Sequence, residues 1–246
     1  MIELDTDGHR SGLRPQDQAV VAIAGELDAA GLFAGVMTHA GESYNATSVA
    51  GITAISEQER AGAVAAADAI RAAGIAVPCV SVGSTPTMVH GGSRAGVTEV
   101  RAGVYMFFDL VMAGIEVCRL DDIALGVVAS VIGHQRERGW IITDAGWMAL
   151  SRDRGTQRQR IDQGFGLVLD TDRRPLGDLI VVSTNQEHGI VAHRDGGPVD
   201  FDAFPIGREL LILPNHACAT AGQHQGYHLR GPDGAITGFW PRFSGW

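Results

Sequence analysis

The chain has 246 residues, of which 45% are hydrophobic and 19% charged, and its formal net charge is −9. This length allows one large domain or two smaller ones, while the negative charge argues against a nucleic-acid partner, because phosphate binding needs a basic face. No window approaches the roughly 20 apolar residues of a membrane span, no signal peptide is visible, and three widely spaced cysteines suit a reducing cytoplasm, where we expect the protein.

Roughly the first 110 residues alternate between apolar runs and helical patterns. We expect strands at 2–5, 32–38, 75–82 and 99–108, and helices at about 17–30 and 56–73, the second with Glu57 and Glu59 in its first turn. Near-continuous apolar strands separated by helices are typical of a parallel sheet that helices cover. Four such units amount to half of a (β/α)8 barrel. Because no element precedes the strand at 2–5, we expect a chain that begins midway through that barrel.

The pattern changes after about residue 115. Short β-type runs separated by turn residues replace the helical periodicity. The expected strands are 124–132, 140–143, 166–169, 179–183, 209–213 and 227–230. This second part of the sequence therefore predicts an all-β domain.

Polar residues that could take part in binding or catalysis cluster where the first strands end. Gly83-Ser84-Thr85 offers backbone N–H groups and two hydroxyls that suit a phosphate, although a Ser/Thr-rich turn is the simpler alternative. His39 could stack on a flat cofactor and Tyr44 could hydrogen-bond to it, or both could simply cap the barrel rim. Arg10 could hold an anion, or it could be a surface arginine in a turn. The pattern lacks the lysine of a nucleotide-binding P-loop.

His216-Ala217-Cys218 places an imidazole and a thiol two residues apart. If the segment is extended, both side chains point to the same face and could bind one zinc ion. Two ligands make a weak site, so His188 and His224 are further candidates. The alternative is a buried cysteine beside a surface histidine. Two acidic loop motifs, Asp144-Ala145-Gly146 and Glu187-His188-Gly189, matter only if they lie close to the pair.

Seven stretches, taken together, resemble the D-serine dehydratase and D-threonine aldolase family. They are residues 7–12, 38–44, 82–87, 100–105, 144–146, 187–189 and 214–220, with Gly-Ser-Thr-Pro-Thr and His-x-Cys the most specific. That family joins an alanine-racemase-like barrel, which binds pyridoxal 5′-phosphate (PLP), to a C-terminal β domain. The resemblance implies an α/β plus β fold. Residues 1–115 would form the C-terminal half of the PLP-binding barrel, and residues 116–246 the β domain with a metal site.

The resemblance also implies a set of cofactor-binding residues: Arg10, His39, Tyr44, Gly83, Ser84, Thr85 and Tyr105. Residues 83–85 would bind the PLP phosphate. Arg10 would lie near the phenolic oxygen of the cofactor, His39 would pack against its ring, and Tyr44 would reach the pyridine nitrogen.

His216 and Cys218 would hold Zn²⁺, with Mn²⁺ or another divalent metal as alternatives. In the dehydratases of this family the metal engages the β-hydroxyl of the substrate and makes it a better leaving group. The aldolase branch more often carries aspartate at the position of Cys218. The His-x-Cys motif therefore favours a dehydratase.

The chain departs from the family because it contains no lysine: all 19 basic residues are arginine. It therefore cannot form a Schiff base through a lysine ε-amine, and the family's PLP lysine lies upstream of every matching stretch. We can thus identify no catalytic residue. We expect an N-terminally truncated, incomplete form that does not catalyse the reaction by the standard mechanism.

The expected function is that of a PLP- and zinc-dependent D-amino-acid lyase. It would remove water and then ammonia from a D-β-hydroxy amino acid of the D-serine, D-threonine or 3-hydroxyaspartate type. That small molecule is the expected partner, and the complete enzyme is expected to be a homodimer. Two alternatives stay open: a D-threonine aldolase, which yields glycine and an aldehyde, and a non-catalytic PLP- or metal-binding remnant.

Overall fold

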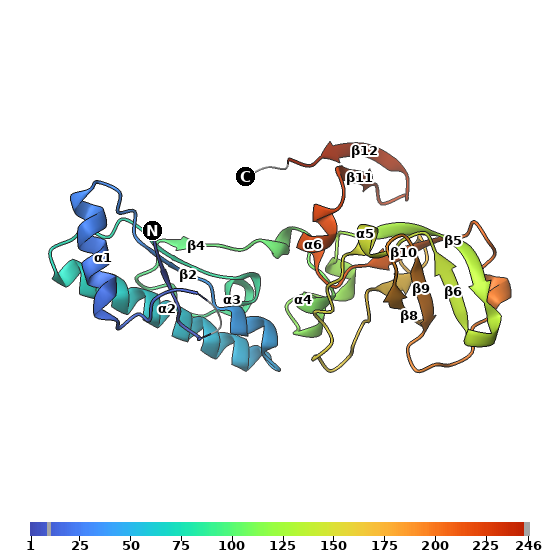
Figure 1. Ribbon diagram of the computed structural model, residues 1–246, viewed down its shortest axis with the longest axis horizontal. Coiled ribbons are helices and arrows are strands. Elements are labelled where there is room, and N and C mark those ends of the chain that lie inside the picture. The colour runs from blue at the N-terminus through green and yellow to red at the C-terminus, as the bar shows by residue number, and fades with distance from the viewer. Residues whose placement is uncertain (9–10, 244–246) are drawn as a thin grey trace. The chain divides into compact units, whose positions relative to one another are not determined.

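The structure, a computed structural model, describes residues 1–8 and 11–243 and divides into two compact units (Figure 1). Unit 1 comprises Met1–Tyr105 and Ile115–Val117, and unit 2 comprises Met106–Gly114 and Cys118–Trp246. Across the described residues, we find no helix with the length and apolar character that a membrane span requires.

Unit 1 is built on a four-stranded parallel sheet. Its elements are β1 (Ile2–Leu4), α1 (Gln18–Ala29), β2 (Val36–Thr38), η1 (Gly41–Asn45), α2 (Val49–Ala72), β3 (Val80–Val82), α3 (Thr85–His90), β4 (Glu99–Val100) and the 3-10 turn η2 (Val104–Met106) at its end. The strand order β1-β2-β3-β4 follows the sequence, and each neighbouring pair is parallel. The parallel sheet predicted from the apolar runs is thus confirmed. All four strands consequently end at the same edge of the sheet.

The core of unit 1 lies between this sheet and helices α1 and α2. Figure 1 shows the long α2 running along the strands. Buried strand residues are Ile2, Leu4, Val36, Val80 and Val82, and buried helix residues include Val20, Ala24, Ala63, Ala66, Ala67 and Ile70. The short alanine side chains on α2 let the helix pack closely against the strands.

Several predicted boundaries in unit 1 are wrong, and the expected strands at 32–38 and 75–82 begin only at Val36 and Val80. Helix α2 begins at Val49, seven residues before the expected start, with the Ser48 hydroxyl accepting from the Gly51 amide at 3.1 Å. Gly51 and nearby β-branched residues lower the helix propensity of this first turn, which hid the start. The expected strand at 99–108 ends at Val100, and residues 85–90 form helix α3 rather than a turn.

Unit 2 contains a closed six-stranded antiparallel barrel. Its helices and strands are α4 (Leu110–Gly114), β5 (Val127–Gln135), β6 (Trp140–Thr143), α5 (Trp147–Leu150), β7 (Leu167–Leu169), β8 (Pro175–Thr184), β9 (Gly189–His193), β10 (Glu209–Leu213), α6 (Ala217–Gly222), β11 (Gly226–Arg230) and β12 (Ile236–Pro241), with 3-10 turns at Leu120–Asp122, Arg136–Arg138 and Phe201–Ala203. Around the barrel the order is β10-β5-β6-β9-β8-β7, and pairing of β7 with β10 closes it. The predicted β character of this part is confirmed, although strands β9 and β12 were not expected.

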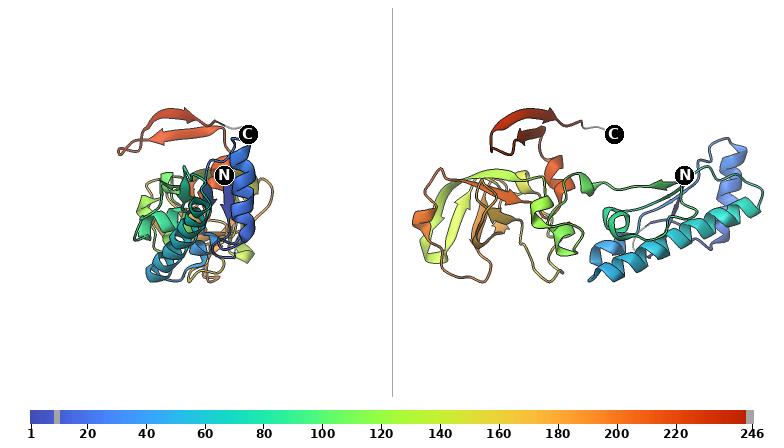
Figure 2. Two further views of the ribbon diagram at one scale, coloured as in Figure 1. Left: turned by 90° about the vertical axis from the view of Figure 1, so that its left-hand side faces the viewer. Right: turned by 180° about the vertical axis from the view of Figure 1, so that it is seen from behind.

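Alternate side chains of the barrel strands point inward and form the core of unit 2. This core includes Val131, Ile141, Val168, Val181, Val191, Leu210 and Ile212. The hairpin of β11 and β12 forms a separate two-stranded sheet, and both views in Figure 2 show it projecting from the barrel. At the end of β10 the chain leaves the closed barrel and continues directly into the segment that carries His216 and Cys218.

Candidate functional site

The loops after β2 and β3 lie together at the carboxyl edge of the sheet in unit 1. The Nδ1–H of His39 donates to the carbonyl of Gly83 at 3.2 Å, and the His39 ring lies 5.9 Å from that of Tyr44, centroid to centroid. The hydroxyls of Ser43 and Ser84 are hydrogen-bonded at 3.0 Å. Parallel strands place their ends side by side, so these contacts join segments about 40 residues apart in the chain.

The segment that follows β4 also contacts this cluster. The backbone amide of Tyr105 donates to the hydroxyl of Thr85 at 3.2 Å. Six of the seven sequence-predicted cofactor residues are therefore connected by direct contacts or chain adjacency: His39, Tyr44, Gly83, Ser84, Thr85 and Tyr105. The seventh, Arg10, lies outside the described residues.

Glu59 holds the two loops of this cluster together, and the sequence pattern did not reveal it. One oxygen of its carboxylate accepts the amide of Ala40 and the amide of Gly83, both at 3.0 Å. The side chain is 1% exposed. Burial raises the pKa of Glu59, and the two backbone amides oppose that rise. Its predicted place in a first helical turn was wrong, because α2 begins ten residues earlier.

The donor set of the cluster can be compared with what PLP requires. Buried hydroxyls of Ser84 and Thr85 lie at the start of α3, where a phosphate group finds donors, and an imidazole and a phenol lie beside them for the ring. The Gly83 amide is already donated to Glu59. Gly83 is needed for space instead, since its φ is +123° and a Cβ there would lie 2.4 Å from the carbonyl oxygen of Arg101. The group as a whole fits the cofactor.

In unit 2, His216 and Cys218 do not lie in a strand, so the alternation argument for their shared face was wrong. His216 is the N-cap of α6, with φ −132° and ψ 101°, and Cys218 lies in the first turn of that helix. The two side chains nevertheless lie close enough to interact, since Cys218 is the largest cause of the raised pKa of His216. Cys218 is exposed rather than buried.

Electron-rich groups surround the His216 ring. Hydrogen bonding to Cys218 raises the pKa of His216 to about 9, burial lowers it, and Asp153 adds to the rise. The Asp153 carboxylate lies 2.6 Å from Nδ1 of the ring. An imidazole nitrogen and a thiol are donors that zinc accepts, so this pair fits a divalent metal ion.

Backbone bonds fix the segment that carries the pair. The amides of Leu110 and Val111 donate to the carbonyls of Pro214 and Asn215 at 3.0 and 3.3 Å. The buried carboxylate of Asp109 accepts the amide of Ala217 at 2.9 Å. Because β10 and α4 both belong to unit 2, the positions of His216 and Cys218 are set by the barrel itself.

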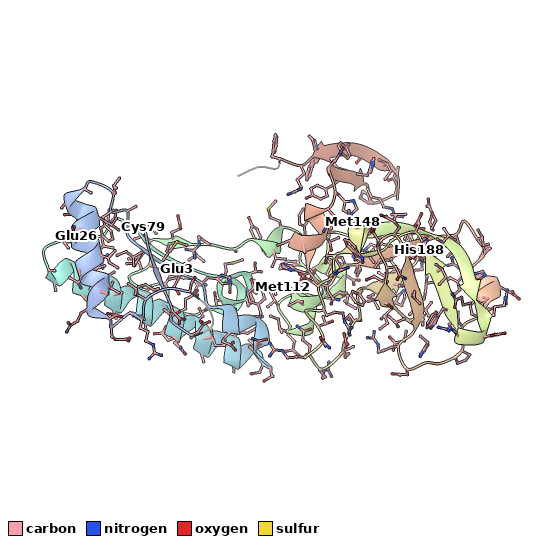
Figure 3. The ribbon with its side chains drawn as sticks, in the orientation of Figure 1. Glu3, Glu26, Cys79, Met112, Met148 and His188 are labelled. Carbon is pink, nitrogen blue, oxygen red and sulfur yellow. The ribbon has the colours of Figure 1, made fainter. Side chains whose placement is uncertain are left out.

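No third ligand completes a metal centre within residues 1–8 and 11–243, where no group of three or more His, Cys, Asp or Glu side chains is placed to hold an ion. His188 lies in the exposed loop between β8 and β9 (Figure 3). His224 is hydrogen-bonded through Nε2 to the carbonyl of Ala149 at 3.0 Å. Asp144 accepts the amide of Ser130 at 2.7 Å, which agrees with a turn role.

Two family models match the chain. The one described as alanine racemase, N-terminal domain, matches residues 1–111, and the putative serine dehydratase domain matches residues 124–230. D-threo-3-hydroxyaspartate dehydratase of Delftia sp. (strain HT23) is 52% identical over 100% of this chain and 65% of its own length. D-serine dehydratase of Dictyostelium discoideum is 30% identical over 96% of this chain and 61% of its own length.

Solved structures of D-threo-3-hydroxyaspartate dehydratase are also similar to this chain. A metal-free cysteine-to-alanine variant of D-threo-3-hydroxyaspartate dehydratase superimposes with a TM-score of 0.94 at 51% identity, covering 99% of this chain and 65% of the other. A histidine-to-alanine variant of that enzyme has a TM-score of 0.95 at 51% identity, covering 99% of this chain and 64% of the other. The chain thus spans a little under two thirds of the relatives it matches. It has the alanine-racemase-like fold with a closed β-barrel domain, and it belongs to the D-serine dehydratase family.

Proposed function

We propose that this chain carries the PLP-binding and zinc-binding residues of a D-amino-acid dehydratase. The substrate would be a D-β-hydroxy amino acid of the 3-hydroxyaspartate type, which loses water and then ammonia to leave a keto acid. The observation that carries the proposal is the His216–Cys218 pair in unit 2, in a chain whose unit 1 gathers the hydroxyls, imidazole and phenol of a PLP site.

The relatives support the substrate class. The Delftia relative is named for D-threo-3-hydroxyaspartate, and the Dictyostelium relative is named for D-serine. The solved cysteine-to-alanine variant of the former enzyme is described as metal-free. This supports a metal-binding role for a cysteine in that enzyme, and by our proposal for Cys218 here.

Each residue would have a defined task. Bound PLP would acidify the Cα–H of the substrate, and Zn²⁺ held by His216 and Cys218 would act as a Lewis acid on the β-hydroxyl. Ser84 would bind the cofactor phosphate through its hydroxyl, since its amide is donated to the hydroxyl of Thr87, and Thr85 would contribute its hydroxyl and amide. In unit 1, the hydrogen bond from His39 to the carbonyl of Gly83 would hold the imidazole in place against the cofactor ring. The phenol of Tyr44, beside it, would bind the pyridine nitrogen.

We extend the proposal to the whole architecture. Unit 1 would belong to a PLP-binding barrel and unit 2 to a metal-binding β domain, which moves residues 106–114 of the expected barrel range 1–115 into the β domain. The four parallel strands of unit 1, in sequential order, are what half of a (β/α)8 barrel presents. The homodimer and the cytoplasmic location remain predictions.

Zinc and PLP binding can be measured on the chain itself. We expect the purified chain to bind about one Zn²⁺, as the ligand pair implies, and to change the absorbance spectrum of added PLP. Cys218→Ala should remove zinc binding without altering the PLP titration. Cys79→Ala is the matched control, because Cys79 precedes β3 in unit 1, and it should keep the zinc (Figure 3). A folded wild-type chain that binds neither ligand would refute the proposal.

Activity can be tested in a chimera in which this chain replaces the matching region of the Delftia enzyme. The chimera should release ammonia and a keto acid from D-threo-3-hydroxyaspartate, and Cys218→Ala should abolish that release. Glycine plus an aldehyde as products would establish the aldolase alternative instead. A chimera that binds PLP and zinc yet converts none of D-threo-3-hydroxyaspartate, D-serine and D-threonine would indicate a non-catalytic protein.

A further inference from the structure

The side chain of Asp153 contacts the imidazole of His216 from a distant part of unit 2. Its Oδ2 lies 2.6 Å from Nδ1, although the two residues are 63 positions apart. Asp153 belongs to the long loop between α5 and β7, and nothing in the sequence pattern drew attention to it. We propose that Asp153 is a positioning residue, which occupies Nδ1 of His216 so that Nε2 is the nitrogen offered to a metal ion. This inference rests on the zinc site of the proposed function.

The chemistry of imidazole explains the choice of nitrogen. A carboxylate only accepts hydrogen bonds, so Nδ1 must carry the proton that joins it to Asp153. In a neutral ring the lone pair then resides on Nε2. A histidine that binds a metal commonly donates its other N–H to a carboxylate, which fixes the tautomer and the ring orientation and strengthens the ligand.

Buried hydrogen bonds hold in place both segments that form this contact. Thr156, in the same loop as Asp153, is buried and donates its hydroxyl to Asn215 at 2.8 Å. Asn215 directly precedes His216, and its side-chain amide donates to the carbonyl of Gly164 at 2.5 Å. The loop is therefore tied to the segment that carries His216 by buried bonds next to the Asp153 contact.

The Asp153 carboxylate contacts a ring nitrogen of His216. Over the described part of the chain, its carboxylate does not form a metal-holding group of three with His216 and Cys218. With 48% of its side chain exposed, Asp153 also contributes little packing to the core. Its substitution should consequently affect the histidine rather than the fold.

The test compares the zinc affinity of the full chain with that of its Asp153 variants, by competition with a chromophoric chelator. Asp153→Ala should weaken Zn²⁺ binding by about 10- to 100-fold, the usual effect of losing such a partner. Asp153→Asn keeps an acceptor oxygen without the charge and should recover part of the loss. Asp121→Ala removes an exposed aspartate from a 3-10 turn of unit 2 and should leave the affinity unchanged. Thermal melts of the four proteins should coincide.

A second readout identifies the nitrogen directly. The ¹⁵N chemical shifts of His216 in the zinc-loaded wild-type chain should show Nε2 bound to the metal and Nδ1 protonated. Zinc on Nδ1, or wild-type affinity in Asp153→Ala, would overturn the inference while leaving the zinc site standing. If the wild-type chain binds no zinc, the metal part of the proposed function fails first, and this inference fails with it.

Discussion

Glu59→Ala should lower the free energy of unfolding of unit 1 by about 4 kcal/mol, because it leaves two buried N–H groups without an acceptor, at roughly 1–3 kcal/mol each. The Glu59 side chain is 1% exposed. The amides that would lose their acceptor belong to Ala40, next to His39, and to Gly83, next to Ser84. The same substitution should therefore loosen both loops of the proposed PLP site. Urea denaturation and PLP titration measure the two effects.

Glu59→Gln separates the shape of this side chain from its charge. Both amides bond to the same oxygen, which the glutamine carbonyl can replace. Burial raises the pKa of Glu59 in the folded chain above that in the unfolded chain, so protonation favours folding. That contribution is fully present below the unfolded pKa and is lost as the pH rises through the folded pKa. The stability of Glu59→Gln relative to wild type should thus increase with pH across this window.

Glu57→Ala provides the control on the same helix. Glu57 pairs with Arg60 on the surface, its side chain is 54% exposed, and such pairs contribute at most about 1 kcal/mol. If Glu59→Ala were no more destabilising than Glu57→Ala, the proposed bracing of the two loops would be wrong. A flat pH dependence of the difference between Glu59→Gln and wild type would contradict the argument from burial.

Much of the architecture follows from local pattern alone. Apolar runs alternating with helices predict a parallel sheet, and short runs between turns predict an all-β domain, because each pattern indicates which faces must be buried. Boundaries depend on weaker signals. Ser48 is a good N-cap, but Gly51 after it disguised the first turns of α2. The expected strand at 99–108 was apolar enough, yet only Glu99 and Val100 pair with β3.

The candidate site shows where prediction from sequence stops. Parallel strands must end at one edge, so the gathering of His39, Ser84 and Tyr105 could be expected, while their roles stay predictions. Glu59 contacts the cofactor-residue loops of unit 1, and Asp153 contacts His216 in unit 2, through tertiary contacts that no motif records. Carboxylates on a predicted helix usually indicate a solvent-exposed face, so Glu57 and Glu59 look alike in the sequence. Only the burial of Glu59 in the structure distinguishes it from Glu57.

Asp109→Ala should destabilise unit 2 by about 4 kcal/mol and weaken zinc binding as well, because two buried amides lose their acceptors at roughly 1–3 kcal/mol each. One carboxylate oxygen of Asp109 accepts the amide of Ala217 at 2.9 Å, and the other accepts that of Met112 at 3.0 Å. Both Asp109 and Met112 are buried. Asp109→Asn retains only one acceptor oxygen, so its effect on the unfolding free energy should be intermediate.

Asp122→Ala is the matched control, since the Asp122 carboxylate also accepts a backbone amide, that of Arg119 at 2.8 Å. Its side chain is 42% exposed, so water can take the place of the lost acceptor and the cost should stay below about 1 kcal/mol. Denaturation and zinc competition together then distinguish two kinds of aspartate. Asp109 fixes the backbone at the start of α6, so its loss should reduce stability and affinity together, whereas loss of Asp153 should reduce affinity alone. Wild-type stability in Asp109→Ala would show that the start of α6 is not held by this carboxylate.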